Sequence, residues 1–204
     1  MKLCMIGTGY VGLVSGTCFS DLGNKVYCVD NDIKKIENLN RGISPIYEPG
    51  LNEIIKVNYK AKRLIFTSDL SLAVKNSDII FICVGTPTKK GSNSVDLSYI
   101  NKAITQILKE SKKRKIIVTK STVPVGTGDE IKKRLKKNKK NNFQVISNPE
   151  FLREGEAIRD FRYPDRIVVG ADNKKLFTVM KKLYQPLISK GAKFFTTSNR
   201  GAEL

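Results

Sequence analysis

The stretch that most constrains the fold is Gly7-Thr8-Gly9-Tyr10-Val11-Gly12, which lies between an apolar run and a helical pattern. In a strand–turn–helix of this kind, the first glycine permits a tight turn and the second lets the backbone approach a pyrophosphate. The third lets the helix pack closely on the strand. The helix N-terminus then offers free N–H groups and a positive dipole end to phosphate oxygens. Residues 7 to 12 therefore predict a dinucleotide site.

A second apolar run, Val26–Val29, ends in Asp30, 18 residues beyond Gly12. A carboxylate at that strand end can accept hydrogen bonds from a ribose 2′-hydroxyl, and it would repel a 2′-phosphate, so the pattern favours NAD over NADP. Other interpretations remain open at this point. Asp30 or Asp32 could simply cap a helix that begins at Ile33, and the two lysines that follow could soften the discrimination against phosphate.

Apolar or β-branched runs alternate with helical patterns along the whole chain. The runs are Leu3–Ile6, Val26–Val29, Leu64–Phe66, Ile79–Val84, Ile116–Thr119, Phe143–Ile146, Ile167–Val169 and Phe194–Phe195. This alternation predicts an α/β fold, a doubly wound and mainly parallel Rossmann-like sheet of about eight strands with helices on both faces. We find no internal repeat and no Pro/Ser-rich linker, so we expect a single domain.

Polar groups follow three of these runs, at 85–88, 121–123 and 148–154. The carboxyl ends of parallel strands line one crevice of an open α/β sheet, so we expect these segments to converge. In the third, Glu150 and Glu154 are four residues apart and would share one face if a helix starts there. Each feature alone also fits ordinary turn chemistry or a solvated helix start.

Cysteine, histidine and hydropathy restrict the function further. The sequence has no histidine, and Cys4, Cys18, Cys28 and Cys83 show no close-pair spacing, so we predict no metal site and interpret the cysteines as buried small hydrophobic residues. No apolar run approaches the ~20 residues of a membrane span, and glycines interrupt the apolar N-terminus too early for a signal peptide. We expect a cytoplasmic protein with no membrane partner.

The net charge of +18 is high, and much of it lies in two lysine-rich runs, 109–115 and 132–140. Such runs can bind nucleic acid or another anionic partner. They can equally form a solvated lysine-rich face. Neither run contains an aromatic residue on which a base could stack, and this favours the solvated face. We therefore expect no nucleic-acid partner.

Seven motifs in order along the chain now suggest a family. They are IGTGYVGL (6–13), VDND (29–32), PIYEPGL (45–51), VGTPT (84–88), TKSTVPVGTG (119–128), SNPEFLREG (147–155) and PDRIVVG (164–170). With them the chain resembles the N-terminal half of the UDP-glucose/GDP-mannose dehydrogenases. NPEFLREG followed by PDRIVVG is closer to the UDP-glucose enzymes than to those acting on UDP-N-acetylmannosamine, while the GDP-mannose enzymes share part of it and are the nearest alternative. Those two, and a stand-alone NAD-binding module without chemistry, are the alternatives.

The resemblance implies oxidation of a sugar C6 alcohol to a carboxylate, in two hydride transfers to NAD, with UDP-glucose as the substrate. It implies cofactor binding by Gly7, Thr8, Gly9, Tyr10, Val11, Gly12, Asp30, Lys35, Val84, Gly85, Thr86, Pro87, Ser121, Thr122, Val123 and Glu154. It implies substrate binding by Glu150, Phe151, Leu152, Arg153 and Glu154. The catalytic residues it implies are Thr122, Glu150 and Glu154, of which Thr122 and Glu150 would order the catalytic water.

The resemblance also implies a division of the family enzyme. Residues 1–198 correspond to the NAD-binding domain, and 199–204 to the start of a long connecting helix. The rest of that helix and the C-terminal UDP-binding domain, with the nucleophilic cysteine and a catalytic lysine, would lie beyond Leu204. We therefore expect an NAD-binding half that is inactive alone. Full-length members of the family form homo-oligomers.

Overall fold

The computed structural model describes residues 1–89, 91–92, 94–111, 113–139 and 142–204. Its strands are β1 (Lys2–Ile6), β2 (Lys25–Val29), β3 (Leu64–Thr67), β4 (Ile79–Ile82), β5 (Lys115–Thr119), β6 (Phe143–Ser147), β7 (Arg166–Gly170) and β8 (Lys193–Thr197). Its helices are α1 (Tyr10–Asp21), α2 (Ile33–Asn40), α3 (Leu51–Lys60), α4 (Leu70–Lys75), α5 (Ser98–Glu110), α6 (Thr127–Lys137), α7 (Ala157–Arg162), α8 (Lys174–Ile188) and α9 (Asn199–Glu203).

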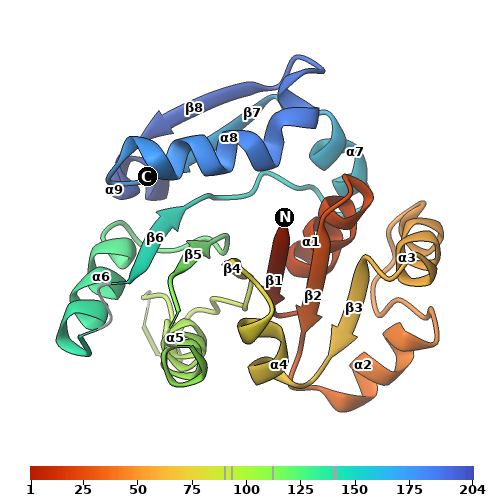
Figure 1. Ribbon diagram of the computed structural model, residues 1–204, viewed down its shortest axis with the longest axis horizontal. Coiled ribbons are helices and arrows are strands. Elements are labelled where there is room, and N and C mark those ends of the chain that lie inside the picture. The colour runs from red at the N-terminus through yellow and green to blue at the C-terminus, as the bar shows by residue number, and fades with distance from the viewer. Residues whose placement is uncertain (90, 93, 112, 140–141) are drawn as a thin grey trace.

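The described strands form one sheet in the order β3-β2-β1-β4-β5-β6-β7-β8 (Figure 1). All neighbouring pairs are parallel except β6 and β7, which are antiparallel and share only the register pair Ser147 and Gly170. The order reverses between β1 and β4, where the chain moves from one half of the sheet to the other. The prediction of a doubly wound, mainly parallel sheet is confirmed.

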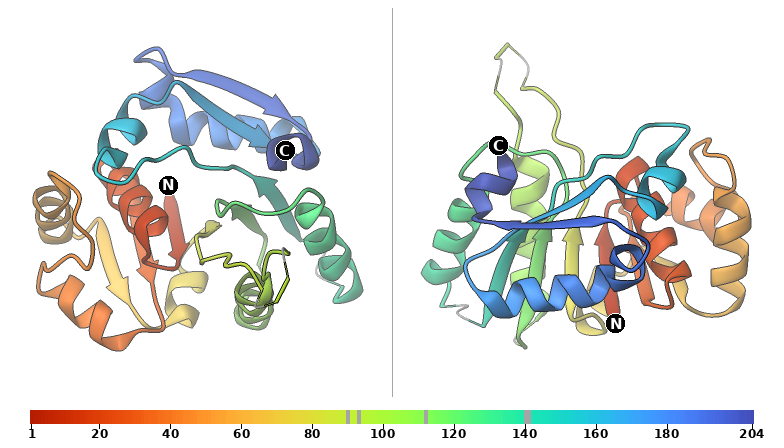
Figure 2. Two further views of the ribbon diagram at one scale, coloured as in Figure 1. Left: turned by 180° about the vertical axis from the view of Figure 1, so that it is seen from behind. Right: turned by 90° about the horizontal axis from the view of Figure 1, so that it is seen from above.

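Both faces of the sheet are covered by helices, as the views from behind and from above also show (Figure 2). Side chains alternate along β1: Leu3 and Met5 join an apolar core with α1, α3, α7 and α8, whereas Cys4 and Ile6 join a second core with α4, α5 and α6. Because each central strand is buried on both faces, its sequence is a continuous apolar run rather than an alternating one.

One charged residue lies where the sequence suggested solvent. Lys115 closes the first lysine-rich run and was expected on a solvated face, but it is the first residue of β5 and only 3% exposed. Its ammonium donates hydrogen bonds to the backbone carbonyls of Lys75 (3.4 Å) and Ser77, just beyond the end of α4. The prediction was wrong here because carbonyls freed at a helix end compensate the charge.

The carboxyl ends of β1, β2, β4, β5 and β6 lie along one edge of the sheet, because these strands are all parallel. The segments that follow them hold each other in place. Ser121 Oγ, after β5, donates to the carbonyl of Val84, after β4, at 2.7 Å. Thr86 Oγ1, after β4, donates to the carbonyl of Thr122, after β5, at 2.9 Å. The predicted convergence of these strand ends is confirmed.

Candidate functional site

Three glycines lie in the turn between β1 and α1, and the space around a Cβ would differ at each of them. Gly7 has a φ of +98°, and a Cβ there would lie 2.8 Å from the carbonyl oxygen of Cys83. A Cβ on Gly12 would lie 1.9 Å from the carbonyl oxygen of Gly7, so the helix can pack this closely only on a glycine. At Gly9 the φ is −70° and a Cβ would meet nothing within 4 Å.

The fold itself therefore does not require a glycine at position 9. The open space lies at the N-cap of α1, where the first N–H groups of the helix have no intrahelical acceptor. A pyrophosphate that rests on this backbone is the kind of group for which the missing side chain leaves room. The residues present thus fit a dinucleotide.

Asp30, at the end of β2, is tied to this turn. Its Oδ2 accepts hydrogen bonds from the Thr8 backbone N–H (2.9 Å), from Thr8 Oγ1 (2.7 Å) and from Lys35 Nζ (3.1 Å). Partial burial opposes ionisation, but the bonds from Thr8, Asp32 and Lys35 outweigh it and lower the pKa of Asp30 to about 2. The carboxylate is therefore ionised at neutral pH, as a ribose-binding or phosphate-repelling group must be.

The capping alternative for Asp30 is settled by the geometry. Asp32 is the N-cap of α2, and its Oδ1 accepts from the Lys35 backbone N–H at 3.0 Å. Asp30 instead faces the glycine turn, and its Oδ1 accepts from the Asp32 backbone N–H at 3.1 Å. The side chain of Lys35 reaches back to Asp30, which places a cation beside the expected ribose position.

The segment after β6 differs from the expectation. No helix starts at Glu150, because residues 148–156 are irregular and α7 begins only at Ala157, so the argument that Glu150 and Glu154 share a helical face was wrong. Backbone N–H groups of this segment donate to side-chain carboxylates rather than to the backbone carbonyls of a helix. The Leu152 N–H donates to Glu150 Oε2 at 2.6 Å, and the Arg153 N–H donates to Asp160 Oδ2 at 2.9 Å.

A residue that the sequence did not single out organises this segment. Glu48 is only 7% exposed and lies in the PIYEPGL motif. Its carboxylate accepts from Tyr10 Oη at the start of α1, from the Gly155 N–H (2.9 Å) and from the Ile158 N–H (3.2 Å). Partial burial, together with the bond to Glu48, raises the pKa of Tyr10 to about 12, so the phenol stays protonated. The motif's acidic residue joins the glycine turn to the segment after β6.

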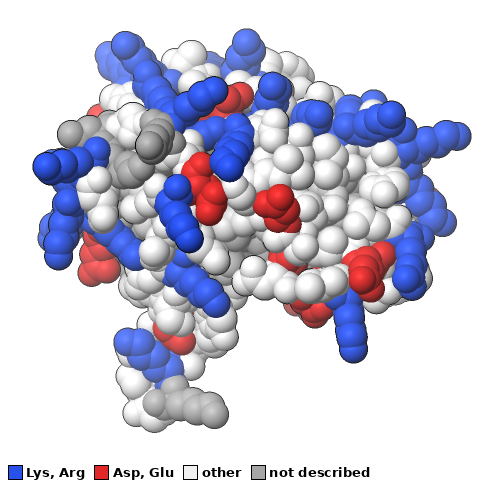
Figure 3. All heavy atoms as spheres, turned by 60° about the horizontal axis from the view of Figure 1, so that its bottom comes forward, with Lys and Arg blue, Asp and Glu red and all other residues white. Residues whose placement is uncertain are grey.

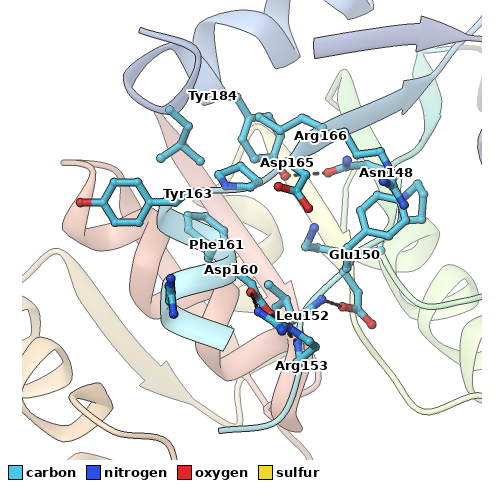
Figure 4. Close-up of a pocket in the computed structure, with 17 residues that line it drawn as sticks. Asn148, Glu150, Leu152, Arg153, Asp160, Phe161, Tyr163, Asp165, Arg166 and Tyr184 are labelled. Carbon is cyan, nitrogen blue, oxygen red and sulfur yellow. Dashed lines mark hydrogen bonds and ion pairs between the residues drawn. The ribbon is translucent and has the colours of Figure 1, made fainter. Parts of the chain in front are cut away.

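A cavity of about 640 Å³ opens between this segment, α7 and the start of β7 (Figure 4). Glu150 and Asp165 lie along it, and Asn148 and Tyr184 form its inner wall, where Tyr184 Oη donates to Asn148 Oδ1 at 2.7 Å. Lys120, 4% exposed, also lines it. Burial lowers the pKa of Lys120 against the attraction of nearby Cys83 and Glu150.

A smaller hollow of about 220 Å³ lies next to the end of β5. Thr122, Glu150 and Phe151 line it, together with Glu203 of α9. The structure thus brings the two residues expected to hold a water, Thr122 and Glu150, to the wall of one space. Glu154 is exposed and does not line either hollow, so the structure does not bring it into this group.

Residues 1–188 match the family described as the UDP-glucose/GDP-mannose dehydrogenase family, NAD binding domain. The chain belongs to this family. It is 48% identical over 207 residues to the UDP-glucose 6-dehydrogenase of Rhizobium meliloti (strain 1021), covering 100% of this chain and 47% of that protein. It is 48% identical over 187 residues to UDP-glucose 6-dehydrogenase TuaD of Bacillus subtilis (strain 168), covering 91% and 40%.

Two solved structures share the fold over almost the whole chain. The GDP-mannose dehydrogenase of Pseudomonas aeruginosa, in a ternary complex, gives a TM-score of 0.92 at 36% identity and covers 100% of this chain and 48% of its own. A UDP-glucose dehydrogenase of Pyrobaculum islandicum gives 0.91 at 35% identity, covering 98% and 47%. The chain therefore spans about half the length of the curated relatives it matches, and it is the NAD-binding part of the family fold.

The cysteines of this family member are buried, as expected. Cys4 and Cys28 lie inside β1 and β2, Cys83 follows β4, and Cys18 faces the core from α1. Burial raises the pKa of Cys18 and of Cys83 to about 12, and it also raises the pKa of Cys4 and Cys28. A thiol in such surroundings carries little thiolate at neutral pH and is a poor nucleophile.

Figure 3 shows how charge is arranged on one face of the molecule. One face has basic side chains around its rim, with acidic side chains among them toward the centre (Figure 3). In the second lysine-rich run, Lys133, Lys136 and Lys137 are exposed on α6, while Lys132 pairs with Asp129 (3.2 Å) and Asp172 (2.8 Å). Lys112 and Lys140 of the two runs lie outside the described residues.

Two further findings concern the described part of the chain only. Nowhere in it do three acidic or cysteine side chains come together in a way suited to a metal ion. None of its helices is both long and apolar enough to cross a membrane.

Proposed function

We propose that this chain is the NAD-binding part of a UDP-glucose 6-dehydrogenase, which oxidises the C6 alcohol of UDP-glucose to the carboxylate of UDP-glucuronate with two NAD. The structural observation that carries NAD binding is the open space at Gly9, beside Asp30 and the N-terminus of α1. The choice of substrate is supported by the 48% identity to two UDP-glucose 6-dehydrogenases over nearly the whole chain.

In this proposal, NAD supplies the hydride acceptor and the chain's own residues hold it. Gly7 to Gly12 support the pyrophosphate, Asp30 accepts from the adenosine ribose, and Lys35 lies beside it. Val84, Gly85, Thr86 and Pro87 after β4, with Ser121, Thr122 and Val123 after β5, line the remainder. Their mutual hydrogen bonds keep this wall in place before the cofactor arrives, which reduces the ordering cost of binding.

The segment after β6 carries the substrate side of the proposal. Glu150, Phe151, Leu152 and Arg153 present backbone and side chain to the UDP-sugar, and Thr122 with Glu150 orders a water on the wall they share. An oriented carboxylate beside a water can take up a proton as that water attacks a carbonyl carbon. The contact of Glu154 with the cofactor stays a prediction of the resemblance, since its exposed side chain lines neither hollow.

Calorimetric titration of the chain with NAD and with NADP tests the cofactor proposal. We expect NAD to bind more tightly, because Asp30 is ionised and would repel a 2′-phosphate. Asp30→Ala should reduce the difference in affinity between NAD and NADP. Equal or tighter binding of NADP by the unmodified chain would overturn the role given to Asp30.

A further inference from the structure

Helix α9 fits into a junction between α6 and the end of β7, and two glycines make room for it. A Cβ on Gly170 would lie 2.6 Å from Ala202 Cβ and 2.5 Å from the Ser198 carbonyl oxygen. A Cβ on Gly128 would lie 2.9 Å from Glu203 Oε1 and 3.2 Å from Asn199 Cβ. Gly128 and Gly170, which belong to the family motifs, thus leave room for α9, although this helix comes later in the chain. The C-terminus lies beside α6 in both views of Figure 2.

Glu203 makes three hydrogen bonds in this junction. Its Oε2 accepts from the Gly126 N–H at 2.8 Å, and its Oε1 accepts from the Gly128 N–H at 2.9 Å and from Ser147 Oγ at 2.8 Å. Gly126 is the N-cap of α6 and has no side chain with which to cap it. A carboxylate 77 residues further along therefore caps this helix, at the end where its dipole favours negative charge.

The groups that donate to Glu203 lie on two segments, and these segments carry Thr122 and Glu150, which both line the smaller hollow. Gly126 ends the loop that carries Thr122 after β5, and Ser147 immediately precedes the segment that carries Glu150 after β6. Glu203 itself lines the same hollow. One carboxylate is thus bonded both to the loop of Thr122 and to the strand end that leads to Glu150.

We propose that Glu203 is a positioning residue that fixes the Thr122 loop against the Glu150 segment. The role of this pair rests on the proposed function, but the geometry of the contact does not. Asn199 supports the arrangement, because its Nδ2 donates to Ser147 Oγ at 3.0 Å and to the Gly170 carbonyl at 3.2 Å. A movement of α9 would consequently reach both loops through a single side chain.

Amide hydrogen exchange measured by NMR tests the proposal on the chain itself. In Glu203→Gln, one of the two carboxylate oxygens is replaced by an NH2 group that cannot accept, so at least one of the Gly126 and Gly128 amides loses its acceptor and should exchange at least about tenfold faster. The methyl signal of Thr122 should shift, while amides in the middle of α6 stay unchanged. Arg200→Ala is the matched control. It removes an exposed contact between the same two helices, Arg200 Nε to Asp129 Oδ2 at 2.6 Å, and should move none of these signals.

Ser147→Ala separates the two sides of the contact. It removes the bonds that Ser147 Oγ makes with Glu203 and with Asn199, both on the Glu150 side, so the Leu152 amide should exchange at least about threefold faster while Gly126 and Gly128 stay within about twofold. If Glu203→Gln does not fold, this variant decides. The proposal is overturned if either folded variant leaves its loop signals unchanged, or if exchange rises uniformly across the chain. Titration of the same samples with NAD separates a failure of the proposed function from a failure of the role given to Glu203. If the unmodified chain does not bind NAD, that result counts against the proposed function alone.

Discussion

Asp30 makes its contacts before any nucleotide arrives. The bonds to Thr8 hold the glycine turn against the end of β2, so the carboxylate has a structural task besides the proposed ribose contact. Gly9, the N-cap of α1, is the reverse case, because nothing in the fold requires it to be glycine. The two positions therefore predict different outcomes on substitution.

We expect Gly9→Ala to fold normally and to bind NAD at least about tenfold more weakly, because the added methyl group enters only the space left for the pyrophosphate. Gly12→Ala should instead destabilise the chain, since its Cβ would meet the Gly7 carbonyl oxygen at 1.9 Å. Thermal unfolding and calorimetry on both variants check this. Unchanged NAD affinity in Gly9→Ala would contradict the position given to the pyrophosphate.

The lowered pKa of Asp30 predicts a pH dependence of stability. A carboxyl group with a pKa of about 2 when folded, against 3.8 ordinarily, stabilises the fold above about pH 4 and loses that contribution as the pH falls towards 2. Asp30→Asn has no such group. The difference in melting temperature between the two proteins should therefore shrink between pH 4 and pH 2. Scanning calorimetry at several pH values measures it, and a difference that stays constant would refute the prediction.

At the scale of elements, the sequence predicts regular structure better than the segments between. Every described strand overlaps its predicted run, with ends shifted by at most two residues, because central parallel strands are continuous apolar runs. The segment after β6 was misjudged because its N–H groups donate to carboxylates, one within the segment (Glu150) and two outside it (Asp160 and Glu48). Glu48 is 107 residues from Gly155, and no local pattern indicates such a contact. Lys115 was missed for the same reason, since its carbonyl partners lie on another element.

Glu48 predicts how strongly this segment depends on one side chain. Glu48→Ala leaves the Ile158 N–H without its acceptor and the Gly155 N–H with Tyr10 Oη in place of two acceptors, so we expect a loss of about 1–3 kcal/mol in the free energy of unfolding. Urea denaturation measures this, and proteolysis should become faster near Gly155. Glu53→Ala, at an exposed acidic position on α3, is the control and should stay within about 0.5 kcal/mol. A loss no larger than the control's would show that Glu48 does not hold the segment.

At the scale of the whole molecule, the described part of the chain supplies walls for the candidate site but no reactive thiol. The walls after β1, β4, β5 and β6 are built, but the described cysteines are buried and carry little thiolate. The two-step oxidation expected of the family needs an activated thiol for its second step. The family motifs indicated the walls of the site. The side-chain contacts between them became visible only with the fold.

We therefore expect residues 1–204 alone to bind NAD but not to oxidise UDP-glucose at a useful rate. NADH formation followed at 340 nm, with NAD and UDP-glucose both present, checks this. The control is a relative of full length under the same conditions. Turnover near about 1 s⁻¹ by this chain would mean that the catalytic groups all lie within it. Recovery of activity on adding a C-terminal half as a separate chain would support Thr122 and Glu150 as part of a shared site.

The joint between β6 and β7 has a consequence for the order in which the molecule forms. The two strands share one register pair, whereas β7 and β8 share five and are linked by α8. Residues 1–147 can complete six parallel strands without the last two. During synthesis on a ribosome, that part can therefore assemble first and expose the apolar side of α1 until Phe161 and Tyr184 arrive to cover Phe19. The last quarter of the chain would then be the last part to pack on the apolar core.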